Sequence, residues 1–217
     1  MSRRIVLSAG LSALLCCIAA STSFAATATV GQLFTPVNNC VGPFTYLQTR
    51  SPSLGASYVI PFDGVITSWA WHAGATPVTG LKLKVGHAVG GGQFVIDTEA
   101  PAGSQTPNAA TSYPANIPVK AGEIIGITQN GGNCISPDVG YEYPYFIGDI
   151  PPSSTPVTPT ATNQDGSLPV QVIVTQTPTT TDQRAPALKR CKMRAQKHHW
   201  SKKRLKKCRK KARLLPV

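Results

Sequence analysis

Short apolar segments separated by clusters of Gly, Pro and Asn fill residues 29–176, and no other feature constrains the fold of this chain as much. The segment Val65–His72 is rich in β-branched and aromatic residues, and in residues 81–86 apolar side chains alternate with Lys82, Lys84 and a glycine. A period of two is that of a half-exposed strand, so both lysines are predicted to face solvent. No segment here has a helical period of more than two turns. The pattern predicts an all-β fold, a β-sandwich of the jelly-roll kind.

Residues 1–25 have the pattern of a secretory signal peptide. Arg3 and Arg4 precede an uncharged apolar run, and small residues lie before Ala25, where cleavage is expected, although cleavage after Ala28 also fits. The apolar run, about 16 residues, is shorter than the roughly 20 that a spanning helix needs. We therefore expect a secreted, extracellular protein without a transmembrane segment.

Removal of this signal leaves four cysteines: Cys40, Cys134, Cys191 and Cys208. An even number of cysteines in an exported chain predicts disulfides rather than metal ligands, and there is no Cys-x-x-Cys pair. Cys40 and Cys134 are the two that lie in the β-rich part, so we expect them to pair. Closing so long a loop stabilises the fold by roughly 4–5 kcal/mol in the chain-entropy model.

Charge divides the chain sharply. Residues 26–183 contain four Lys or Arg against all nine Asp and Glu, whereas residues 184–217 contain 15 Lys or Arg and no acid. A weakly acidic body with a strongly basic tail is typical of a protein that uses the tail as an electrostatic arm. A segment rich in Pro and Thr, residues 177–186, is predicted to be an extended linker between them, and residues 151–160 have the same composition.

The tail, residues 187–217, contains a short internal repeat in which Leu188–Ala195 recurs as Leu205–Ala212. In both copies Leu, Cys and Ala fall at i, i+3 and i+7, which is a narrow apolar stripe on a basic helix. Folding the repeat into an antiparallel hairpin about His199 places Cys191 opposite Cys208. The sequence therefore predicts a disulfide-linked helical hairpin, for which the alternative is a disordered, solvated charge run.

Local signals support the ends of both helices. Pro186 suits the first turn of one helix and Pro216 the end of the other, while Ser201 is a good N-cap. Trp200 before that cap is predicted to pack on Leu205 as a hydrophobic staple.

Such a hairpin is expected to bind polyanions: acidic envelope or matrix polymers, anionic lipid surfaces, or nucleic acid without sequence specificity. An antimicrobial action of the tail is an alternative. The predicted binding residues are the following cations: Lys189, Arg190, Lys192, Arg194, Lys197, Lys202, Lys203, Arg204, Lys206, Lys207, Arg209, Lys210, Lys211 and Arg213.

Two rows of aromatic residues in the body allow a second function. Trp69 and Trp71 are two residues apart and share a face of one strand, as do Tyr141, Tyr143 and Tyr145. Exposed, these rings would form a platform for sugar rings, as in carbohydrate-binding modules. Large aromatic residues are usually buried, so the favoured interpretation places the tryptophans in the core and the tyrosines over a sheet edge.

Signals for catalysis are weaker. A secreted hydrolase would need His72 or His87 to meet Asp97 or Glu99 in one concave site, and neither histidine lies in a nucleophile-elbow or zinc-protease motif. The sequence therefore predicts a non-enzymatic protein, with no metal and no cofactor.

The segments Val30–Gln32, Pro61–Trp69, Gly80–Val85 and Ile117–Gly126 together resemble a group of secreted bacterial proteins with a β-sandwich body and a Lys/Arg-rich tail with spaced cysteines. The resemblance covers most of the mature chain and implies that architecture, but it implies no activity. Ala121–Gly126 also resembles strand entries in jelly-roll carbohydrate-binding modules.

Overall fold

The computed structural model describes residues 25–52, 55–177 and 184–215. The predicted signal peptide, apart from Ala25, lies outside the described residues, and so do residues 178–183 of the predicted linker.

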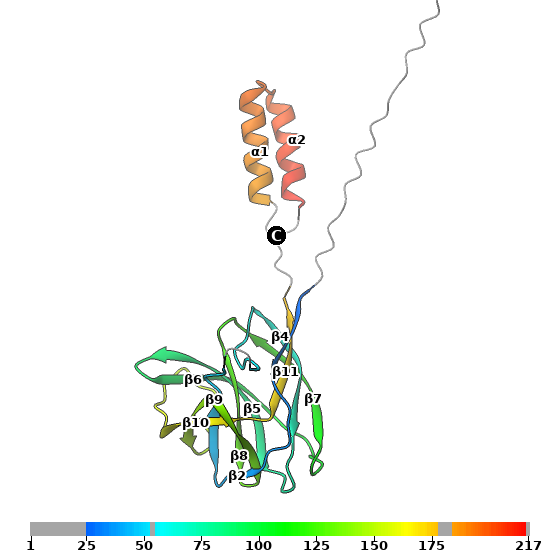
Figure 1. Ribbon diagram of the computed structural model, residues 1–217. Coiled ribbons are helices and arrows are strands. Elements are labelled where there is room, and N and C mark those ends of the chain that lie inside the picture. Colours follow the sequence, from blue (N-terminus) through cyan, green and yellow to red (C-terminus); the bar gives the residue numbers. More distant parts are fainter. Residues whose placement is uncertain (1–24, 53–54, 178–183, 216–217) are drawn as a thin grey trace, which may run out of the picture.

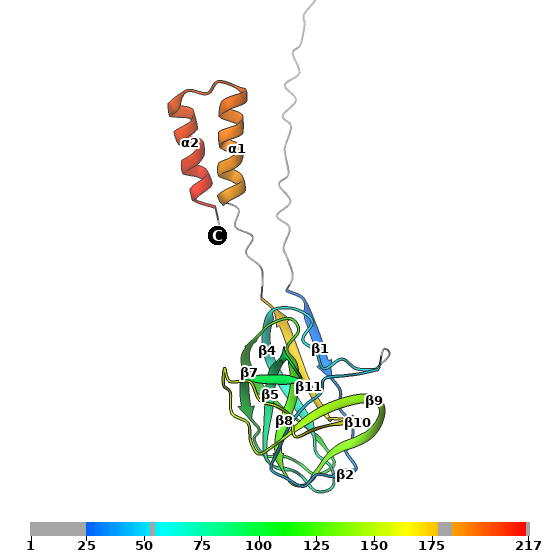
Figure 2. The ribbon, with the colours of Figure 1, turned by 90° about the vertical axis from the view of Figure 1, so that its left-hand side faces the viewer.

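Two antiparallel sheets form the β-rich part (Figures 1 and 2). The small sheet has the strand order β1-β11-β4-β7, and the large sheet has the order β10-β9-β3-β8-β5-β6, with β2 paired to β9. The strands are β1 (Thr27–Gly31), β2 (Asn38–Asn39), β3 (Phe44–Leu47), β4 (Gly64–His72), β5 (Thr79–Gly90), β6 (Gln93–Pro101), β7 (Ala110–Val119), β8 (Ile124–Asn130), β9 (Asn133–Ile147), β10 (Ala161–Ser167) and β11 (Val170–Gln176).

The strand order confirms the predicted sandwich. The orders β1-β11-β4-β7 and β3-β8-β5-β6 are those of the two four-stranded sheets of a jelly roll. Strands β9 and β10 are an additional hairpin on the edge of β3, which widens the large sheet.

The main core lies between the sheets. Side chains that alternate along the strands point inward, such as Leu83 and Val85 of β5, Ile125 and Ile127 of β8, and Val172 of β11. The predicted disulfide Cys40–Cys134 is confirmed, with a Cα–Cα distance of 5.8 Å. It ties the chain after β2 to the start of β9.

Residues 149–160 cover part of the outer face of the large sheet and pair with its edge strand β6, so the expectation that this Pro/Thr segment is an extended spacer is wrong. Ile150 and Val157 pack against a second cluster, formed by Leu47, Ile96, Ile124 and Phe146. The amide of Ser153 also donates to the carbonyl oxygen of Ile96 at 2.9 Å. Two apolar residues and backbone hydrogen bonds are enough to order a segment that composition alone describes as a linker.

Lys84 lies beneath this cover, which corrects the prediction that both lysines of β5 face solvent. Its side chain is fully buried, whereas that of Lys82 is 29% exposed. Lys84 Nζ donates to the Glu99 carboxylate, to Asp149 Oδ1 at 2.6 Å and to the carbonyl oxygen of Ile150 at 2.8 Å. Lys82 contacts the same two carboxylates from the solvent side. The four side chains form a closed ionic cluster.

This cluster makes the stability of the sandwich dependent on pH. Burial raises the pKa values of Glu99 and Asp149, but hydrogen bonds and charges from Lys84 and Lys82 outweigh burial and hold both below their usual values. A lowered carboxyl pKa stabilises the fold above the unfolded-state value, about 4, and that stabilisation is lost as the pH falls further through the folded-state value. We expect the urea midpoint to fall from pH about 5 downward. In a Glu99→Gln, Asp149→Asn variant the urea midpoint should change less with pH below about 5 than in the unchanged protein. The same pH dependence in both proteins would contradict a role for these two carboxylates.

Candidate functional site

The C-terminal residues form the predicted helical hairpin, with α1 (Arg184–Lys197) and α2 (Lys202–Arg213) side by side in both ribbon views (Figures 1 and 2). Neither helix has the length and hydropathy that crossing a membrane requires. Pro186 lies in the first turn of α1, as predicted. Ser201 caps α2, since its side chain accepts from the Arg204 amide at 3.4 Å.

The turn between the helices is a Schellman motif. His199 has a φ of 46°, and the amide of Trp200 donates to the carbonyl oxygen of Ala195 at 3.1 Å. Arg204 lies over the Trp200 ring, with its guanidinium carbon 4.7 Å from the ring centroid. This cation–π contact was not predicted, and the proposed staple between Trp200 and Leu205 stays a prediction.

A disulfide holds the hairpin together. Cys191 and Cys208 are bonded, with a Cα–Cα distance of 5.9 Å, which confirms the predicted pairing of the two repeats. Within the helices, Cys191 and Ala212 are the buried residues. At the open end, Arg184 Nε donates to the carbonyl oxygen of Leu215 at 2.6 Å. Two small buried side chains make a very small core, so the bond between the helices supplies much of the constraint.

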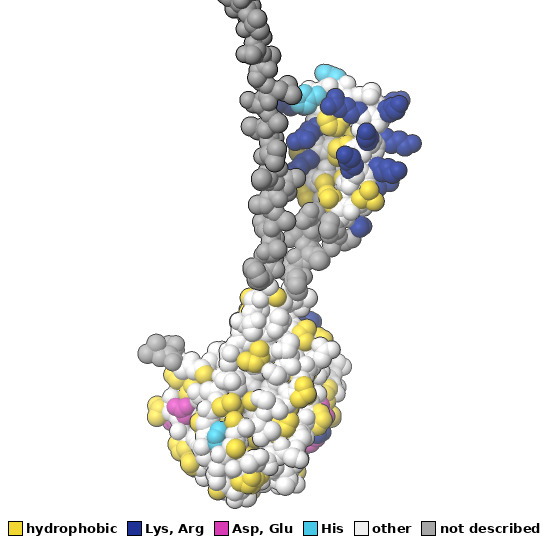
Figure 3. Space-filling view, turned by 90° about the vertical axis from the view of Figure 1, so that its right-hand side faces the viewer, with side chains coloured by type: hydrophobic (Ala, Val, Ile, Leu, Met, Phe, Trp, Pro, Cys, Tyr) yellow, Lys and Arg dark blue, Asp and Glu magenta, His cyan; other side chains and the backbone are white. Residues whose placement is uncertain are grey.

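All fourteen cations that were predicted to bind polyanions are exposed. Figure 3 shows Lys and Arg side chains spread over the hairpin, with apolar side chains between them. Along one side of α2, five of these cations surround the apolar Leu205 and Leu214; they are Lys202, Lys206, Arg209, Lys210 and Arg213. Residues three or four apart on a helix are about 5–6 Å from each other, so this side is a continuous row of positive charge.

The aromatic platform proposed from the sequence is wrong for four of its five residues. Trp69 and Trp71 do share a face of β4, but that face is the core side, and they are only 1% and 0% exposed. Tyr141 and Tyr143 are buried too, so among these five only Tyr145 keeps partial exposure. The favoured interpretation of the tryptophans as core residues is confirmed.

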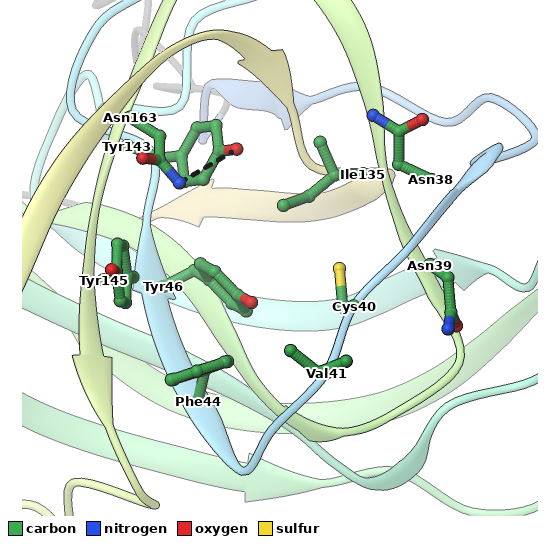
Figure 4. Close-up of a pocket in the computed structure, with 10 residues that line it drawn as sticks. All are labelled: Asn38, Asn39, Cys40, Val41, Phe44, Tyr46, Ile135, Tyr143, Tyr145 and Asn163. Atoms are coloured by element: carbon green, nitrogen blue, oxygen red, sulfur yellow. Dashed lines mark hydrogen bonds between the residues drawn. The ribbon is translucent and has the colours of Figure 1, made fainter.

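Tyr143 and Tyr145 nevertheless line a hollow of about 350 Å³ on the large sheet, shown in Figure 4. All ten lining residues come from β2 and the two residues after it, β3, β9 and β10: Asn38, Asn39, Cys40, Val41, Phe44, Tyr46, Ile135, Tyr143, Tyr145 and Asn163. Sequence reasoning missed Phe44 and Tyr46, although they alternate along β3 as the tyrosines do along β9. That shared alternation is the signal that would have found them.

The histidines and acids that a hydrolase would need are only partly brought together. His87 Nδ1 lies 2.7 Å from Asp97 Oδ2 on the large sheet, where both side chains are partly exposed. His72 lies on β4 of the small sheet, with Nδ1 3.0 Å from its neighbour's carbonyl oxygen, and Glu99 belongs to the cluster around Lys84. Within the described ranges, no three His, Cys, Asp or Glu side chains are grouped so as to hold a metal ion.

Comparisons of the chain with known protein families, curated proteins and solved structures found no match.

Proposed function

We propose that the helical hairpin retains a secreted protein on anionic polymers of a cell envelope or extracellular matrix. The observation that carries this proposal is the set of fourteen exposed cations on a disulfide-closed unit whose sequence, residues 184–215, contains no acid. The hairpin would act as the binding element, and the sandwich would be the body that it holds in place.

The physical reason for polyanion binding is the repulsion among the cations of the hairpin. Cations placed a few ångströms apart repel one another and oppose folding. Residues 184–215 contain no Asp or Glu whose charge could relieve this repulsion. A polyanion relieves the repulsion and releases counterions, which is favourable at low salt. Acidic glycans, anionic lipid head groups and nucleic acid all offer such charges. The apolar stripe is too narrow for deep insertion into a bilayer.

Binding to dextran sulfate tests this function. In the test variant, the five cations on one side of α2 become glutamine: Lys202, Lys206, Arg209, Lys210 and Arg213. The matched control exchanges Lys for Arg and Arg for Lys at the same five positions. We expect the glutamine variant to bind about tenfold or more weakly at low salt, with a slope of log K against log salt that is reduced by about 0.7–0.9 for each contributing cation.

The charge-conserving control should bind like the unchanged protein, and uncharged dextran should retain none of the three. Equal retention of the glutamine variant and the control on dextran sulfate would contradict a role for these charges.

A further inference from the structure

The hollow on the large sheet exists because of the hairpin β9–β10, which the jelly-roll order does not require. This hairpin extends the large sheet past β3, and no lining residue of the hollow belongs to the small sheet. At the hollow, the inner face of the large sheet is therefore open to solvent, whereas along β5 and β8 the same face packs against the small sheet in the core. We propose that this hollow binds a neutral saccharide, at a site separate from the cationic hairpin.

One wall of the hollow is a fixed set of aromatic rings (Figure 4). Phe44 meets Tyr145 edge-on at 5.4 Å between ring centroids, and it meets Tyr46 at 6.0 Å in the same way. Buried Tyr46 contacts both partly exposed rings, Phe44 and Tyr145, and buried Tyr143 packs edge-on against Tyr46 in turn. Rings that are already immobilised lose little entropy when a ligand stacks on them. Sugar rings carry apolar C–H faces that suit such a surface.

Amides lie on both sides of the hollow. Asn38 and Asn39 come from β2, across the hollow from the rings, and Asn163 of β10 lies beside Tyr143, with its Nδ2 3.5 Å from the tyrosine hydroxyl. An amide both donates and accepts hydrogen bonds, as a sugar hydroxyl does. The hollow thus combines apolar ring surface with several polar groups, and ligand sites use both kinds of surface.

The wall that carries Asn38 and Asn39 is also held in place. The disulfide Cys40–Cys134 ties it to β9, and Cys40 itself lines the hollow. The amide of Cys40 donates to the carbonyl oxygen of Gly132 at 2.8 Å, and the amide of Val37 donates to that of Ile135 at 3.2 Å. Both walls are thus anchored on β9, so the hollow is preformed.

Charge determines the class of ligand. None of the ten lining residues is Lys, Arg, His, Asp or Glu. Burial raises the pKa of Tyr46 to about 12 and also raises that of Tyr143, so these phenols stay neutral donors at physiological pH. A phosphate, sulfate or carboxylate would find no cation among these residues. The volume, about 350 Å³, is at the small end of the roughly 300–1,000 Å³ seen for ligand pockets.

Apolar surface continues from the hollow to its rim. Along β9 the residues on this face become progressively more exposed, from buried Tyr141 and Tyr143 through Tyr145 to Ile147, which is 67% exposed and pairs with Phe44. On the opposite wall Val41 is 72% exposed. An oligosaccharide seated in the hollow can extend over these residues, so we expect a chain of sugars to bind more tightly than a single sugar.

Calorimetric titration of the mature protein tests the site, with cellotetraose, mannotetraose and N-acetylchitotetraose as neutral probes. Adenosine is included because a nucleobase can also stack on aromatic rings. At least one tetrasaccharide should bind. Tyr145→Ala should weaken that binding by about tenfold, while Tyr145→Phe, which keeps the ring, should stay within about threefold. Val139→Ala, at an exposed residue that does not line the hollow, should leave binding unchanged.

Asn163→Ala provides a second variant outside the ring cluster, and it should weaken the same binding while the urea midpoint stays near that of the unchanged protein. The hollow is not a saccharide site if none of the three tetrasaccharides binds at millimolar concentration, if adenosine alone binds, or if Tyr145→Ala binds as the unchanged protein does. Loss of dextran sulfate binding in the α2 glutamine variant should leave saccharide binding intact, which separates the two sites.

Discussion

Replacing Lys84 with methionine should lower the free energy of unfolding of the sandwich by about 2–4 kcal/mol. The methionine fills the space of the lysine stem, but Glu99 and Asp149 lose their buried partner, and the carbonyl oxygen of Ile150 loses a donor. Removing one partner of a buried ion pair usually costs about 3–5 kcal/mol. We expect less here because both carboxylates keep some contact with water, at 25% and 38% exposure.

Lys82→Met is the matched control for this change. Lys82 is the same residue type on the same strand and contacts the same two carboxylates, but its side chain is 29% exposed, so the loss should be below about 1 kcal/mol. Urea unfolding followed by the fluorescence of the buried Trp69 and Trp71 measures both variants. Equal losses for the two lysines would mean that burial of Lys84 does not set the strength of the cluster.

The sequence pattern was sufficient to predict the strands but not the ionic cluster around Lys84. Alternation in residues 81–85 correctly placed the leucines and valine on the core side and the lysines on the other side. It could not show that the other side is covered, because the cover comes from residues 149–160 and the compensating charges from Glu99 and Asp149. Those contacts are long-range in sequence, and composition described the covering segment as a linker.

The aromatic residues show the same limit. Spacing predicted correctly that Trp69 and Trp71 share a face, yet a period of two does not say which face meets the second sheet. The hollow depends on pairing that local pattern does not contain: β9 lies beside β3 along residues 44–46, which brings Tyr145 opposite Tyr46. β3 alone carries two alternating rings and β9 alone carries three, so neither strand by itself shows the combined cluster.

The helical hairpin was predicted almost completely because its information is local. The two repeats lie 17 residues apart, and the cap at Ser201 and the turn at His199 lie between them. Once both repeats are helical, antiparallel pairing allows few arrangements that bring Cys191 to Cys208. The cation–π contact of Arg204 with Trp200 was missed, since the sequence allowed the ring to pack inward on Leu205 equally well.

The hairpin is short and has a very small core, so its folding should depend on the Cys191–Cys208 disulfide. A double variant, Cys191→Ser with Cys208→Ser, should lose most of the helix in residues 184–215. The buried residues of the two helices are only Cys191 and Ala212, so hydrophobic burial offsets little of the chain entropy. A closed loop of this length contributes about 3 kcal/mol in the chain-entropy model, and the repulsion among 15 cations opposes folding further. Far-ultraviolet circular dichroism should show loss of the helical signal while the sandwich keeps its urea midpoint.

Dextran sulfate should restore part of that helix, because a polyanion that binds the folded hairpin better than the unfolded chain pulls the equilibrium toward the folded form. The free energy spent on folding is then lost from binding, so the serine variant should bind more weakly than the disulfide-linked protein although both carry the same charge. Full helix in the serine variant without the polymer would contradict a hairpin held by its disulfide. Equal affinity of the two proteins would show that charge alone, without the folded hairpin, is sufficient for binding.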